Sequence, residues 1–238
     1  MGREVQNSIV QFERVSLKYG QGAHILEDVS FNLYPGTFHY LTGASGAGKS
    51  SLLKLIYSGL KEYRGTIQIF GRDLRYMKNQ EIALYRQQIG VIFQDFLLLD
   101  HLTTLDNIAL PLRLKGEAWP ASRRKAQQMM TWIGLEGFEE AMPTTLSGGQ
   151  KQRAVIARSV MNKPKILLAD EPTGNLDDEN AAKLLYLFEE LNRGGITIVM
   201  ATHNKDLTAE FPYPIIHLAE GQISIQPPFG REKVANNA

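Results

Sequence analysis

Residues 43–50 read GASGAGKS, a glycine-rich loop with the spacing G-x-x-x-x-G-K-[ST]. The loop follows an apolar segment that is typical of a strand and precedes a segment with helical periodicity, which is the context that a phosphate-binding loop requires. Glycines let successive backbone N–H groups face one anion, and a helix N-terminus adds partial positive charge. We therefore expect nucleotide contacts from the whole loop and the next serine, namely Gly43, Ala44, Ser45, Gly46, Ala47, Gly48, Lys49, Ser50 and Ser51.

Two side chains of this loop have chemistry beyond simple binding. Lys49 is long enough to reach the β- and γ-phosphates of a nucleoside triphosphate, and the Ser50 hydroxyl is a ligand that Mg²⁺ accepts. The alternative is a glycine-rich turn that merely caps a helix. The full motif in its strand-to-helix context favours the phosphate loop.

Polar side chains follow the other apolar segments of the chain. FHYLTG leads into the phosphate loop, IGVIFQ ends in Gln94, KILLADE ends in Asp170 and Glu171, and ITIVMATH ends in His203. Because ligands of an open parallel sheet bind at the carboxyl ends of its strands, these groups should converge beside the bound phosphates. Taken singly, Gln94 could start a turn, His203 could cap a helix, and the two acids could be loop charges.

Phosphoryl transfer needs positioning and charge neutralisation, which assigns a role to each group. Asp170 and Gln94 are expected to join Ser50 at Mg²⁺, and Glu171 to act as general base on the attacking water. His203 would contact the γ-phosphate, so the predicted catalytic residues are Glu171, His203, Gln94 and Lys49. Upstream, Tyr19 offers an aromatic face on which adenine could stack, although a plain surface tyrosine is an equal alternative.

A second glycine turn, LSGGQ, lies at 146–150 and again precedes a helical segment. Ser147, Gly148, Gly149 and Gln150 should bind an anion there, far along the chain from the first loop. One nucleotide needs one phosphate loop. We therefore interpret the second turn as a contact to the γ-phosphate of the nucleotide that another copy of the chain binds. This predicts a two-fold homodimer that ATP closes and hydrolysis opens.

Strands alternating with helices predict an α/β fold with a doubly wound, mostly parallel core. Segments 8–19, 65–71 and 221–226 alternate instead, which suggests an antiparallel, half-exposed sheet. From about 96 to 162 the strand pattern stops and three helical segments follow, so we expect a helical subdomain inserted in the core. The prediction is one domain over 1–226 and a C-terminal tail over 227–238.

The composition excludes several classes of function. The formal net charge is +1, which gives no field for nucleic acid or anionic lipid, and we expect no nucleic-acid partner. There are no cysteines, which excludes disulfides and thiolate chemistry. The apolar segments are too short to span a bilayer, so any membrane contact should go through a partner protein.

These motifs together resemble the ATP-binding-cassette ATPases over nearly the whole chain. Two of the family's motifs match glycine-rich segments: its Walker A motif matches residues 43–50, and its signature motif matches residues 146–150. Its Walker B motif matches residues 166–170 and its D-loop matches residues 174–177. Single residues also match, with Tyr19 as the adenine-stacking aromatic, Gln94 as the Q-loop glutamine and His203 as the switch histidine. The resemblance implies a P-loop NTPase fold: a RecA-like core, an antiparallel β subdomain and an inserted α-helical subdomain. It further implies an ATPase that uses ATP and Mg²⁺, with Asp177 joining Ser147, Gly148, Gly149 and Gln150 in contacts across the dimer.

Within the family, four segments resemble the cell-division ATPases: residues 41–56, 86–100, 167–177 and 199–207. The resemblance implies an integral membrane partner that docks near Gln94–Leu99, with Phe96 and Leu97, Leu98 and Leu99 as its apolar socket unless they are core. It implies a location on the cytoplasmic face of the bacterial inner membrane and control of cell-wall hydrolysis. The alternative subgroup is the lipoprotein-releasing and macrolide-export ATPases, which share DEPTGNLD.

The sequence argues against two other classes of function. A cassette protein acting on nucleic acid or ribosomes usually carries two cassettes, a coiled-coil insertion or basic extensions, and this chain has none of these. A nucleotide-gated scaffold with little turnover would not need Glu171 and His203.

Overall fold

A computed structural model describes residues 7–20, 22–174 and 176–228. Its centre is a six-stranded sheet with the order β10-β9-β3-β8-β7-β6. Strands β9, β3, β8, β7 and β6 run parallel, and β10 pairs antiparallel with β9. The strands of this sheet are β3 (Phe38–Thr42), β6 (Ile89–Ile92), β7 (Ile166–Asp170), β8 (Thr197–Ala201), β9 (Ile215–Ala219) and β10 (Gln222–Gln226).

A second, four-stranded antiparallel sheet has the order β2-β1-β4-β5. Its strands are β1 (Val10–Lys18), β2 (His24–Leu33), β4 (Arg64–Ile69) and β5 (Arg72–Asp73). Strand β1 alternates buried and exposed side chains, as expected for a sheet with one solvated face.

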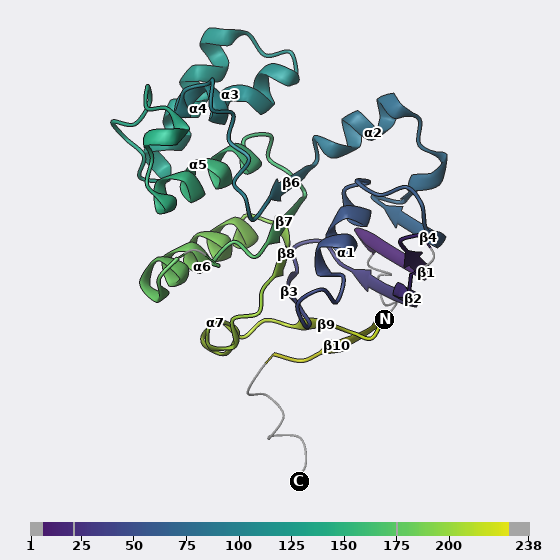
Figure 1. The fold of residues 1–238 in the computed structure, drawn as a ribbon. Coiled ribbons are helices and arrows are strands. Elements are labelled where there is room, and N and C mark those ends of the chain that lie inside the picture. The colour runs from purple at the N-terminus through teal and green to yellow at the C-terminus, as the bar shows by residue number, and fades with distance from the viewer. Residues whose placement is uncertain (1–6, 21, 175, 229–238) are drawn as a thin grey trace, which may run out of the picture.

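Helices occupy the connections between the parallel strands, as right-handed crossovers require. Helix α1 follows the phosphate loop directly, and α3, α4 and α5 all lie between β6 and β7 in the chain (Figure 1). The helices are α1 (Lys49–Ile56), α2 (Asn79–Arg86), α3 (Thr104–Leu114), α4 (Trp119–Trp132), α5 (Gly148–Val160), α6 (Asp178–Arg193) and α7 (Lys205–Glu210), with short 3₁₀ turns at Leu74–Tyr76 and Pro143–Thr145.

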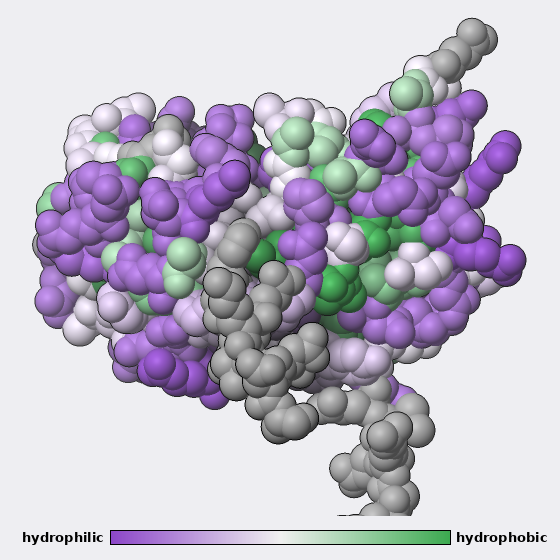
Figure 2. Space-filling model, turned by 90° about the horizontal axis from the view of Figure 1, so that it is seen from below, coloured by the Kyte–Doolittle hydropathy of each residue, from purple (hydrophilic) through white to green (hydrophobic). Residues whose placement is uncertain are grey.

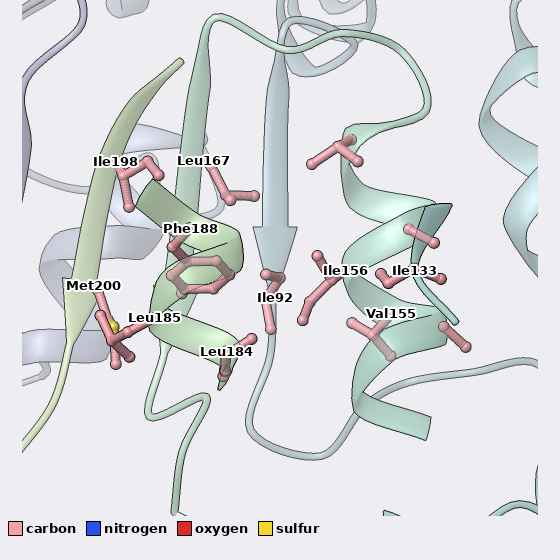
Figure 3. Close-up of a cluster of buried hydrophobic side chains, with 14 of the residues drawn as sticks. Ile92, Ile133, Val155, Ile156, Leu167, Leu184, Leu185, Phe188, Ile198 and Met200 are labelled. Atoms are coloured by element: carbon pink, nitrogen blue, oxygen red, sulfur yellow. The ribbon is translucent and has the colours of Figure 1, made fainter. Parts of the chain in front are cut away.

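The parallel sheet separates two hydrophobic cores. On one face, side chains of α1 pack with the antiparallel sheet. On the other face, α5 and α6 pack against β6, β7 and β8; Figure 3 shows Ile92 of β6 facing Val155 and Ile156 of α5. Strands buried on both faces explain the near-continuous apolar runs in the sequence.

The predicted fold class is confirmed, with one correction to the sheets. The segment 221–226 forms β10 but joins the large sheet rather than the antiparallel one. Strand β10 lies at the edge of that sheet, where Ile223 is half-buried and the other side chains are exposed. Strands β2, β5 and β9 were not predicted from the sequence, whereas α7 forms where a helix after His203 was expected. Strand β2 is irregular, since Asp28 has a left-handed backbone (φ 51°) that interrupts the pairing with β1.

Polar residues cover most of the face seen in Figure 2, and apolar residues gather in one patch to the right of its centre. Among the described residues, no helix combines the length and apolarity needed to cross a membrane. The boundary of the predicted tail at 227 falls just before residues 229–238, which lie outside the described part of the chain.

Candidate functional site: a nucleotide site and a remote signature turn

The phosphate loop has the backbone shape that its sequence predicts. Gly43, Gly46 and Gly48 all have positive φ values, of 154°, 77° and 106°. A side chain at Gly48 is also excluded by space, because a Cβ there would lie 2.4 Å from Cγ2 of Ile25. The close packing on β2 therefore fixes the loop at the start of α1, with its curled backbone at the helix N-terminus.

Lys49 places its charge at the mouth of this loop. Its Nζ donates hydrogen bonds to the carbonyls of Gly43 at 3.0 Å and Ala44 at 3.3 Å. The side chain is largely buried, with 10% exposed. The ammonium is thus held across the loop, where it can meet an anion that the loop binds.

Glu171 joins Lys49 to His203. One carboxylate oxygen, Oε1, lies 3.8 Å from Lys49 Nζ, and the other, Oε2, lies 2.9 Å from His203 Nδ1. Glu171 adopts φ 49°, a left-handed conformation that turns the chain sharply after β7, and its N–H donates to the carbonyl of Ala201 on β8. Such backbone strain in a non-glycine residue is frequent at functional sites. The structure therefore brings together three of the four predicted catalytic residues.

His203 does not cap the following helix. Asn204 does, accepting from the N–H of Leu207 at 3.0 Å. The capping interpretation of His203 is therefore excluded, and its imidazole is 73% exposed beside Glu171.

Gln94 and Asp170 lie at the ends of neighbouring strands. Because Ile92 of β6 pairs with Ala169 of β7, Gln94 follows the strand at the level of Glu171. Gln94 is exposed, and Asp170 is half-buried at the last position of β7. Both are therefore at the predicted edge of the sheet.

The donor chemistry at this edge fits Mg²⁺ bound together with phosphates. Ser50, exposed on the first turn of α1, offers a hydroxyl, Gln94 an amide oxygen and Asp170 a carboxylate. Within the described ranges there is no cluster of three or more His, Cys, Asp or Glu residues suited to a metal. Mg²⁺ commonly uses one or two protein carboxylates plus phosphates and water, so a sparse set of this kind is what it requires.

Tyr19 lies next to the first turn of α1. Its hydroxyl is 3.3 Å from the hydroxyl of Ser51, and its side chain is exposed, with 51% of its surface accessible. The ring is thus fixed beside the phosphate loop while remaining accessible for stacking. Ser51 itself is buried, and its predicted contact with phosphate stays a prediction.

The signature turn is built as a reciprocal helix cap. Ser147 Oγ accepts from the N–H of Gln150 at 3.3 Å, and Gln150 Oε1 accepts from the N–H of Ser147 at 2.8 Å. The turn begins α5, on the face of the parallel sheet opposite to α1 (Figure 1). Gly148 and Gly149 are part of the first helical turn, where the described residues leave open space around Gly148.

Asp177 caps α6. It accepts from the backbone N–H of Asn180 at 2.8 Å, and that bond holds the pKa of Asp177 below its ordinary value. The D-loop match at 174–177 includes Asn175, which lies outside the described residues. Asp177 is therefore fixed at a helix N-terminus, and its predicted contact across a dimer stays a prediction.

A groove of about 620 Å³ runs beside the predicted docking segment. Its walls come from α2, β6, the end of α3 and the end of α5. Leu99 lines this groove, whereas Phe96 and Leu98 pack against the core and Leu97 is exposed outside the groove. The core interpretation therefore applies to Phe96 and Leu98, and the socket interpretation stays a prediction for Leu99.

Comparison with known proteins identifies the family. The family model described as ABC transporter matches residues 26–174, which include both glycine turns and Glu171. The chain belongs to the ABC transporter family. Its ATP-binding-cassette fold places the phosphate loop, the Walker B strand and the signature turn in the positions described above.

The chain is similar to the cell division ATP-binding protein FtsE of several bacteria. Identity is 45% over 215 residues to FtsE of Escherichia coli K12, covering 90% of this chain and 97% of that protein. FtsE of Bacillus subtilis strain 168 is 39% identical over 215 residues, covering 90% and 94%.

The fold matches the dimeric post-hydrolysis structure of the ATP-binding cassette MJ0796, bound to ADP and phosphate. The TM-score is 0.83 at 34% identity, covering 92% of this chain and 98% of that chain. CbiO1 of Clostridium perfringens, part of the cbiONQ transporter complex, gives the same TM-score at 27% identity, covering 93% and 88%.

Some residues that shape this ABC site carry no motif in the sequence. Ile25 and Leu218 crowd the phosphate loop from β2 and β9: a Cβ on Gly43 would lie 2.4 Å from the carbonyl oxygen of Leu218. Both lie on strands, β2 and β9, that were not predicted from the sequence. These two residues could have been found only by predicting β2 and β9 first, because the type of an aliphatic residue does not indicate which segment it packs against.

Proposed function

We propose that this chain is the ATP-binding and hydrolysing subunit of a complex resembling that of FtsE with its membrane partner FtsX, acting in bacterial cell division. The observation that carries the ATPase part is the linked set Lys49, Glu171 and His203 beside the phosphate loop. The cell-division part is supported by 38–45% identity to FtsE proteins over about 90% of the chain. The proposed location is the cytoplasmic face of the inner membrane, held there by the partner.

The residues divide the work of hydrolysis. Lys49 and the loop N–H groups hold the β- and γ-phosphates, and Tyr19 stacks on adenine. Ser50, Asp170 and Gln94 would hold Mg²⁺, which when bound would supply charge neutralisation at the phosphates. Glu171 takes a proton from the attacking water, and His203, 2.9 Å from it, orients the carboxylate.

A homodimer is supported by the glycines of the signature turn. Glycine in a helix costs about 1 kcal/mol relative to alanine. Yet an added Cβ at Gly148 would meet nothing within 4 Å in the described part of the chain, and at Gly149 only Arg153 Nη1 at 4.0 Å. Packing within the subunit therefore does not explain why glycine stands at these positions. The close approach of a nucleotide bound by another copy would explain it.

The groove beside Leu99 is the proposed docking site for the membrane partner. Its apolar lining comes mainly from Phe93, Leu99, Leu110 and Leu114. Its charged lining residues are Arg86 and Arg158, without an acidic residue among those that line it. An amphipathic helix with an apolar face and an acidic side chain complements this surface.

The docking proposal is tested by recovering the tagged protein from detergent-solubilised membranes and identifying what accompanies it. We expect an FtsX-like protein; a lipoprotein-releasing or macrolide-export permease would support the alternative subgroup instead. Leu99→Asp places a charge in the groove and should reduce recovery of the partner at least about tenfold, because that charge is buried on docking. Ile225→Asp is the matched control, since Ile225 is an exposed aliphatic residue on β10 that does not line the groove. Equal recovery with both variants would contradict this docking site.

A further inference from the structure

The segment that follows Gln94 adopts an unfavourable backbone conformation. Phe96 and Leu97 both have left-handed φ values, of 58° and 51°. Neither residue is glycine, and consecutive left-handed residues with bulky side chains are rare because the Cβ crowds the following carbonyl. Something outside the segment must hold it in this shape.

Arg158, on the last turn of α5, makes that contact. Its Nη1 donates to the carbonyl of Leu97 at 2.7 Å and its Nη2 donates to the carbonyl of Phe96 at 3.1 Å. The planar guanidinium donates to both carbonyls at once, which a lysine ammonium does less well. Burial lowers the pKa of Arg158, yet the group stays charged because an arginine pKa lies far above neutrality.

The other end of the segment is held by α3. Asn107 is fully buried, accepts from the N–H of Leu99 at 2.8 Å and donates to the carbonyl of Leu99 at 3.0 Å. The same amide also donates to the carbonyls of Leu102 and Thr103. Residues 96–99 are therefore attached by hydrogen bonds to α5 on one side and to α3 on the other.

The same end of α5 is also pressed against β6. Gly90 of β6 approaches so closely that a Cβ there would lie 2.6 Å from the carbonyl oxygen of Ser159. From Gly148 to Arg158 the helix is about 15 Å long. Helix α5 is thus anchored at its C-terminal end to the docking segment and β6, and it carries the signature turn at its other end.

We propose that Arg158 is a positioning residue that links the docking segment to the signature turn through α5. A shift of residues 96–99 against Arg158 moves the C-terminal end of a stiff helix, and Ser147 to Gln150 move with it. Coupling between two sites is reciprocal, so closing the signature turn on a nucleotide must also act on residues 96–99. The effect of a docked partner on the signature turn rests on the proposed docking site. The effect of nucleotide on residues 96–99, which we call the nucleotide-driven direction, does not rest on it.

Hydrogen exchange of the full chain tests the nucleotide-driven direction without any partner. Exchange of the peptide covering 96–99 is compared with and without Mg²⁺ and the non-hydrolysable ATP analogue adenylyl-imidodiphosphate. In the parent we expect the analogue to change the exchange rate at least about threefold, since the Leu99 N–H is bonded to Asn107. Arg158→Met should abolish most of this change, and Arg158→Lys, which keeps the charge and the stem, should retain part of it.

Arg124→Met is the matched control, because Arg124 is exposed on the neighbouring helix α4. It should behave as the parent does. The proposal would be overturned if the analogue changed the exchange rate of 96–99 in Arg158→Met as much as in the parent. It would also be overturned if the analogue caused no change in the parent itself. If Arg158→Met does not fold, a parental response in Arg158→Lys would overturn it equally. Loss of partner recovery in Leu99→Asp bears only on the docking site, so the two failures are distinguishable.

Discussion

Glu171 shows how much of this site depends on the conformation of one residue. Its left-handed backbone ends β7 and turns the carboxylate toward Lys49 on one side and His203 on the other. A carboxylate held in position by two side chains beside the phosphate loop is well placed to receive a proton from the attacking water. Glu171, Lys49 and His203 thus form one connected unit.

Replacing the base should separate binding from chemistry. Glu171→Gln keeps the side-chain shape but cannot accept a proton, so we expect ATP binding to persist while hydrolysis falls at least about a hundredfold. The variant should also accumulate as an ATP-bound dimer in gel filtration with Mg-ATP. Glu210→Gln, at an exposed site at the end of α7, is the control and should keep the parent rate. Parental turnover in Glu171→Gln would show that another group is the base.

At the scale of elements, the contact between β6 and α5 sets the position of the helical segment. Gly90 is the point of closest approach, and the nearest atom is a backbone oxygen that cannot rotate away. Ile92, two residues on, packs into the same core as Val155 and Ile156 (Figure 3). The strand that leads to Gln94 and the helix that carries the signature turn are therefore packed as one body.

Gly90→Ala should be disruptive although it adds a single methyl group. The helix must move away from the strand, which we expect to lower the free energy of unfolding by about 1–3 kcal/mol. Urea unfolding followed by circular dichroism measures this. If the variant were as stable as the parent, the α5–β6 contact would be looser than the structure has it.

At the scale of the whole molecule, the two glycine turns lie on opposite faces of the parallel sheet. Within one subunit the signature turn therefore has no evident use for the nucleotide held beside α1. The proposed pairing of two copies that face each other would give both turns a function. The similar cassette MJ0796 has been solved as a dimer.

Mixing two inactive variants tests the composite site. Ser147→Asp keeps a side chain that can cap α5 but repels phosphate, and Lys49→Ala removes the charge in the loop. Each variant alone should be inactive. An equal mixture should recover about a quarter of the parent ATPase rate, because half of random pairs are mixed and each mixed pair keeps one of two sites intact. A mixture as inactive as its components would refute the shared site.

The sequence by itself determined the chemistry and the fold class. Motif spacing identified Lys49, Glu171 and His203, because phosphate chemistry tolerates few alternatives in residue type, and doubly buried strands have a recognisable apolar pattern. The sequence also predicted a helix directly after Ser147, because helix-capping hydrogen bonds are local.

Only the tertiary structure decided what depends on contacts distant in sequence. It assigned β10 to the large sheet, placed Phe96 and Leu98 against the core and Leu99 in the groove, and brought Arg158 onto carbonyls 61 and 62 residues away. No local pattern predicts these, because pairing partners and close approaches are set by the packing of the whole chain rather than by the preferences of neighbouring residues.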